Sequence, residues 1–197
     1  MAHVTPLPFD SVPEDIQERF VHYENTRGFT PNSIQTMVRR PNIVRAFMQL
    51  NQAVLYEGTV PEELKMLVSL IASQAAGCRY CQAHMANLCK IYNSSKDKLA
   101  ELWEFETSGH FTDAERAALR LALHGAMAPS QATQEDFDEL FRYFDEDQAV
   151  EIVASIALFG FLNRWNDTMA TDLEELPTEV ARETIGGAYG WEPGKHV

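Results

Sequence analysis

The amino-acid sequence predicts an all-α fold, a single-domain bundle of about eight helices over residues 1–197. Apolar residues recur at spacings of three and four along most of the chain, and helix-capping and helix-ending residues separate these segments. No stretch alternates apolar and polar residues for long enough to make a convincing strand. The composition, 45% hydrophobic and 23% charged, is typical of a folded globular chain that needs no metal or disulfide to hold its core.

Three helices are expected in an N-terminal part, residues 12–58. Asp10 or Ser11 can cap the first, whose early Pro13 and acidic first turn are typical of a helix start. Glycines mark two of the helix ends, because glycine readily adopts the left-handed backbone that ends a helix. The expected spans are about 13–28, 31–38 and 42–58.

A second group of helices is expected in residues 61–174. The first of them carries Leu64, Leu67, Val68 and Ile71 at the spacing of one helical face and stops before Gly77. The next contains all three cysteines of the chain. The expected spans are about 61–76, 78–92 and 94–103, then three helices in 111–173, and an extended tail over 177–197.

Charge and hydropathy exclude several classes of protein. The formal net charge is −13, and nucleic-acid binding needs clustered Lys and Arg, so no nucleic-acid partner is expected. The longest apolar run, residues 152–162, is about half the length of a membrane span, and the first residues lack the pattern of a secretory signal. We therefore expect a cytoplasmic protein without a membrane partner, whose thiols are kept reduced.

The stretch QAAGCRYCQAHMANLC contains a Cys-x-x-Cys pair, Cys78 and Cys81, followed one helical turn later by His84. A zinc site is disfavoured, because all of its ligands would come from one helix and such a row cannot close around one ion. Cys89 has apolar neighbours and is expected to be an ordinary core residue. No metal or bound cofactor is therefore expected.

A redox site explains the pair better. Two thiols at positions i and i+3 in the first turn of a helix have the spacing that a reversible disulfide needs. The helix N-terminus favours a thiolate, and Arg79, between the two cysteines, could add to this effect. His84 lies on the same face as Cys81, within plausible reach for proton transfer.

The segment SQAAGCRYCQAH resembles the signature of the alkylhydroperoxidase D and carboxymuconolactone decarboxylase family. TDAERAALRLA and FLNRWND resemble peroxidase-related members, and the similarity covers about 61–174. The resemblance implies that Cys81 attacks a small hydroperoxide, that Cys78 resolves the sulfenic acid to a disulfide, and that His84 relays protons. It also implies an external dithiol reductant, a protein or a lipoyl-type partner, and a homo-oligomer.

Two departures from the family pattern bear on the proton relay. The family's histidine position is occupied here by Met85, one residue after His84, and its relay acid falls near Met66, which cannot carry a proton. Glu63, one turn earlier on the same helix, is the alternative relay acid, which requires its side chain to point toward the cysteines.

Two other functions stay open. A decarboxylase would use His84, Arg79 and Arg164 around an acidic lactone and would not need the cysteines. A non-catalytic redox sensor would use the thiols without multiple turnovers.

Overall fold

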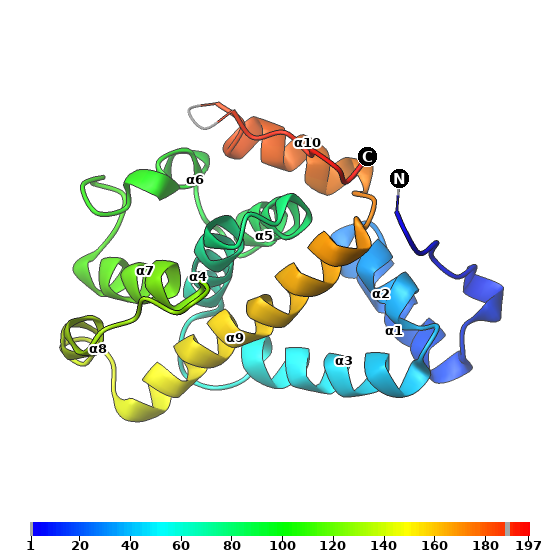
Figure 1. Ribbon diagram of the computed structural model, residues 1–197, viewed down its shortest axis with the longest axis horizontal. Coiled ribbons are helices and arrows are strands. Elements are labelled where there is room, and N and C mark those ends of the chain that lie inside the picture. Colours follow the sequence, from blue (N-terminus) through cyan, green and yellow to red (C-terminus); the bar gives the residue numbers. More distant parts are fainter. Residues whose placement is uncertain (1, 188–189) are drawn as a thin grey trace.

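The computed structural model describes residues 2–187 and 190–197, and within these residues the chain is all-helical, as predicted. It forms one bundle rather than two separate units (Figure 1). Ten α-helices and two short 3-10 helices lie in the described part. The α-helices are α1 Glu14–Arg27, α2 Asn32–Met37, α3 Pro41–Tyr56, α4 Glu62–Ala75, α5 Arg79–Ile91, α6 Lys96–Ala100, α7 Asp113–Gly125, α8 Gln134–Leu140, α9 Glu146–Met169 and α10 Glu175–Thr184; the 3-10 helices are Phe9–Ser11 and Leu102–Glu104.

Helix α4 is the centre of the bundle. Every residue from Leu64 to Ser73 is buried, so this helix is enclosed on all sides rather than on one face. It packs against α5, α7 and α9, and the long α9 runs diagonally across the molecule (Figure 1). The cysteine helix α5 therefore follows directly after an enclosed helix of the core.

Helices α1 to α3 cover the part of the molecule opposite α7 and α8 (Figure 1). The end of α1 is set by Gly28, whose φ of 81° is in the left-handed region that favours glycine. Helix α3 packs against α2, α4 and α9, which brings the N-terminal helices into the same core as the cysteine helix.

The predicted extended tail after Pro177 is wrong in its first part, which forms α10 and packs against α5. Pro177 does not interrupt this helix because it is in the first turn, where a backbone N–H has no partner inside the helix. Residues 190–197 then return along the bundle, and the Leu173 N–H donates to the His196 carbonyl at 3.0 Å. No helix in the described part is both long and apolar enough to span a bilayer.

Candidate active site

The two cysteines of the Cys-x-x-Cys pair lie at the start of α5, as the sequence predicts. Gly77 has a φ of 73°, which turns the chain sharply between α4 and α5. Cys78 is the N-cap residue of α5, and Cys81 is in its first turn. Both side chains are buried with free thiols, and the two thiols lie close enough for each to shift the pKa of the other. The first turn of α5 therefore brings the two sulfur atoms together in a buried position.

The pKa values of the two thiols are shifted in opposite directions. The hydrogen bond from Cys81 lowers the pKa of Cys78 most, burial opposes it, and His196 lowers it further, giving a pKa of about 6. Burial, together with the neighbouring Cys78 sulfur, raises the pKa of Cys81 well above its usual range. The pair thus holds one shared proton at neutral pH, with the charge on Cys78 and the proton on Cys81.

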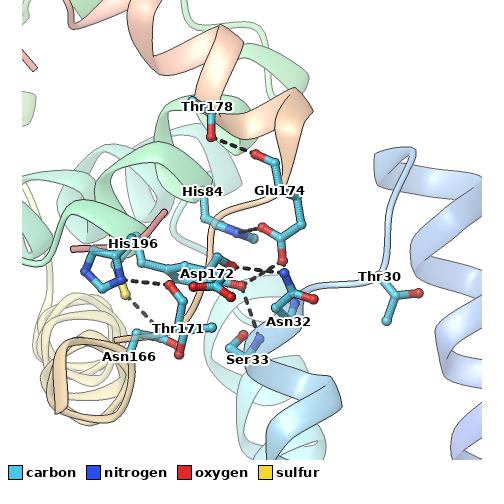
Figure 2. A network of polar contacts seen from close by, with 12 residues as sticks. Thr30, Asn32, Ser33, His84, Asn166, Thr171, Asp172, Glu174, Thr178 and His196 are labelled. Carbon is cyan, nitrogen blue, oxygen red and sulfur yellow. Dashed lines mark hydrogen bonds and ion pairs between the residues drawn. The ribbon is translucent and has the colours of Figure 1, made fainter. Parts of the chain in front are cut away.

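His196 is the imidazole beside Cys78, and no feature of the sequence near it signals this role. Its ring is buried, and Nδ1 donates to the Thr171 carbonyl at 2.8 Å (Figure 2). Nε2 is a buried nitrogen without a hydrogen bond of its own, 3.8 Å from Asp167 Oδ1. The cation expected next to Cys78, Arg79, instead donates to Gln82 at 3.3 Å.

Cys81 receives its polar contact from α9. The Asn166 side-chain amide donates to the Cys81 sulfur at 3.4 Å (Figure 2). Asn166 lies in the FLNRWND segment, so the sequence contained a signal for this residue, although not for its contact with the thiol. The amide stabilises negative charge on Cys81 and partly offsets the effect of burial on its pKa.

His84, one turn after Cys81 on α5, contacts the carboxylate of Glu174, a residue that the sequence analysis does not identify. Its Nε2 lies 2.6 Å from Glu174 Oε2 (Figure 2). The ring stacks on Tyr80 with centroids 4.2 Å apart and meets the edge of Phe29 at 5.3 Å. These contacts fix the orientation of the imidazole.

Glu174 is the N-cap residue of α10, and its carboxylate contacts two further helices, α5 and α2. Besides contacting His84, it accepts hydrogen bonds from the Tyr80 hydroxyl at 3.0 Å and from the Asn32 backbone N–H at the start of α2. Burial alone would raise the pKa of Glu174, but the charge of His84 and these hydrogen bonds outweigh it and lower the pKa. An ionised carboxylate therefore stands behind His84.

The alternative relay acid, Glu63, does not point toward the cysteines. Its carboxylate accepts from the Ser94 hydroxyl at 2.9 Å and pairs with Lys98 at 3.3 Å, near the start of α4. Met66 is buried in the core. The acid of this site thus comes from the segment after α9, which explains why the place of the family's relay acid can hold a methionine.

Cys81 and His84 line the same small cavity of about 50 Å³, together with Tyr80 and Asn166. Most of the remaining lining side chains are apolar, from α1, α3, α5 and α9. Of the three groups a decarboxylase would use, only His84 lines this cavity; Arg164 lines a different one, and Arg79 lies outside both. Over residues 2–187 and 190–197, no three His, Cys, Asp or Glu side chains are grouped as metal ligands.

Comparisons with known proteins identify the family and the fold of the chain. The model of the carboxymuconolactone decarboxylase family matches residues 41–124. A search of the curated proteins found no match.

Three solved structures are similar to the chain over nearly its whole length. The debrominase Bmp8 is 38% identical, with a TM-score of 0.85, over 92% of this chain and 97% of that one. A cysteine-to-alanine variant of Bmp8 in complex with 2,3,4-tribromopyrrole is 37% identical, with a TM-score of 0.86, over 93% and 98%. An alkylhydroperoxidase AhpD core protein of Ralstonia eutropha JMP134 is 24% identical, with a TM-score of 0.77, over 94% and 98%. The chain belongs to the carboxymuconolactone decarboxylase family, as a member with the AhpD-like fold.

Proposed function

We propose that this protein is a dithiol-dependent peroxidase that reduces small hydroperoxides with Cys81 and Cys78. The observation that carries the proposal is the contact between two buried thiols, one of which lines the same cavity as His84. A cavity of about 50 Å³ accepts the peroxide end of a substrate more easily than a bulky ring. The reaction consumes one hydroperoxide and two thiols and yields an alcohol, water and a disulfide.

The reaction steps follow from the proton that Cys81 carries and Cys78 can accept. As Cys81 attacks the outer peroxide oxygen, its proton moves to Cys78, the O–O bond breaks, and Cys81 becomes a sulfenic acid. The departing alkoxide takes a proton from His84, whose positive charge Glu174 stabilises. Cys78 then attacks the Cys81 sulfur, its thiol proton leaves with the hydroxide as water, and an external dithiol reduces the disulfide.

Turnover of cumene hydroperoxide with dihydrolipoamide as reductant tests this scheme. The wild type should turn over many times and, without reductant, lose two of its three thiols while Cys89 stays free, because Cys89 is buried and its pKa is raised. Cys81→Ser should abolish turnover, Cys78→Ser should accumulate a sulfenic acid that dimedone labels, and Cys89→Ser serves as the matched control. Peroxide reduction by Cys81→Ser at the wild-type rate would refute the mechanism, and a single oxidation without further turnover would indicate a sensor.

Reductive dehalogenation is the second candidate, favoured by the 38% identity to a debrominase whose cysteine-to-alanine variant is in complex with a brominated pyrrole. Here the cysteine sulfur would take bromine from the ring, the ring carbon would gain a proton, and the second thiol would displace bromide to form the disulfide. Bromide release from brominated pyrroles, measured with excess dithiol, tests this. A kcat/KM for bromide release above that for peroxide reduction would make dehalogenation the function.

A further inference from the structure

A second cavity, of about 320 Å³, adjoins the small reaction cavity. Arg27 and Leu88 line both cavities, so these two side chains lie between them. The second cavity is unusually basic for so acidic a chain, since Arg19 and His22 line it as well.

Both arginines of this cavity are held by neutral partners. Arg27 donates to the Tyr56 hydroxyl at 2.7 Å, and Arg19 donates to the Gln52 side chain at 3.4 Å. Their guanidinium carbons lie 4.7 and 5.3 Å from the centroid of the Tyr23 ring, within cation–π distance. The two side chains are therefore oriented before any ligand enters.

Neither guanidinium forms an ion pair with a carboxylate in the described part of the chain. Four other arginines do, at 2.5–2.7 Å: Arg45, Arg116, Arg120 and Arg142. Arg19 Nε is moreover a buried donor without a hydrogen-bond partner. An oxyanion placed between the two guanidinium groups would therefore meet N–H donors that no carboxylate of the described part pairs with.

We propose that this cavity, here called the arginine pocket (Arg19, His22 and Arg27), binds the carboxylate of an anionic substrate. The inference rests on the proposed peroxidase function and names its substrate class: hydroperoxides of carboxylic acids. The carboxylate lies against Arg19 and Arg27, and the apolar body passes Leu88 into the cavity that holds Cys81 and His84. Guanidinium groups suit this task because they present several N–H donors in a fixed plane.

A series of hydroperoxy carboxylic acids, with increasing separation between peroxide and carboxylate, tests the proposal when each acid is compared with its methyl ester. For the best-fitting length, the acid should have a kcat/KM about tenfold above that of its ester, as expected for a charge-assisted hydrogen bond that the ester lacks. Arg27→Gln and Arg19→Gln should bring the acid-to-ester ratio toward one, whereas Arg27→Lys keeps part of it. Arg142→Gln, which removes the same charge from a site outside the cavity, should keep the whole preference.

A binding experiment separates this proposal from the peroxidase chemistry. Calorimetric titration of the Cys78→Ser, Cys81→Ser double variant with decanoate and with decanol needs no turnover. We expect decanoate to bind about tenfold more tightly than decanol, and Arg27→Gln to remove the difference. Equal affinities, or acids and esters with equal kcat/KM at every length, would overturn the arginine pocket, while loss of cumene hydroperoxide activity alone would overturn only the peroxidase mechanism.

Discussion

At the scale of single residues, the site depends on side chains that meet from distant parts of the chain. His84 and Glu174 are 90 positions apart, yet the imidazole Nε2 meets the carboxylate of Glu174 in the folded chain. The Cys78 thiol in turn meets His196 from the final segment. Cys78 thus has a buried imidazole beside it, and Cys81 lines the same cavity as a second imidazole, that of His84.

Glu174→Gln tests the relay. Glutamine can still accept from Tyr80 and Asn32, but it cannot balance a positive charge on His84, so peroxide turnover should fall by about 100-fold, in the range of general acid–base effects. Steady-state assays with cumene hydroperoxide give the rate, with the exposed neighbour Glu175→Gln as the matched control. Equal loss of rate in both variants would show that Glu174 has no specific part in the relay.

The pH dependence of the Cys78 thiolate tests the role of His196. Its ultraviolet absorbance should appear with a midpoint at about pH 6 in the wild type, because the Cys81 hydrogen bond, followed by His196, lowers the pKa. His196→Ala should move the midpoint upward yet leave it below that of an ordinary thiol, since the larger contribution remains. His110→Ala, a change at a half-exposed histidine that pairs with Glu101 instead, should leave the midpoint in place; a shift there would contradict the assignment.

At the scale of helices, the sequence predicts where most helices begin and end, but it does not predict which helices pack against one another. α1, α3, α4 and α5 carry apolar periodicity or clear start and stop residues, and their ends fall within a few residues of the predicted ones. α10 forms where the sequence analysis predicts an extended tail, and Pro177 fits within it because the first turn of a helix tolerates proline. The packing of α10 on α5, which delivers Glu174, depends on the tertiary fold and leaves no local pattern.

A carboxylate on α9 holds the turn before α4. Glu151 accepts from the backbone N–H groups of Thr59 and Val60 at 2.8 and 3.0 Å and pairs with the buried Lys65 at 2.8 Å. Gly58, with a φ of 94°, makes room, since a Cβ there would lie 2.3 Å from this carboxylate. Burial alone would raise the pKa of Glu151, but these partners outweigh it and lower the pKa to about 2.

Glu151→Gln should lower the free energy of unfolding by about 3 kcal/mol at pH 7, because it leaves Lys65 as a buried charge without its counter-ion. The folded-state pKa is depressed, so the carboxylate's contribution is complete above about pH 4.5 and is lost as pH falls toward 2. Urea denaturation from pH 7 to acid should therefore show a steeper loss in the wild type than in the variant. The exposed Glu179→Gln serves as control, and parallel acid profiles of wild type and Glu151→Gln would contradict the assignment.

At the scale of the whole molecule, the site draws on nearly the entire chain. The match to the family model, residues 41–124, includes Cys78, Cys81 and His84 but not Asn166, Glu174 or His196. Asn32, which anchors Glu174, and Arg27 lie before it. The local Cys-x-x-Cys motif could be found in the sequence because its members are neighbours on one helix; its partners could not, because only the closed bundle brings them together.

The position of Glu174 has a consequence for the design of variants of this protein. One carboxylate both links the first turn of α10 to α5 and α2 and lies against the imidazole of His84. A random substitution of Glu174 would disturb the packing of these helices and the environment of His84 at the same time, so the two effects could not be separated. Libraries meant to change substrate preference should keep it constant and vary the apolar wall instead, at positions such as Phe47, Leu55 and Phe159.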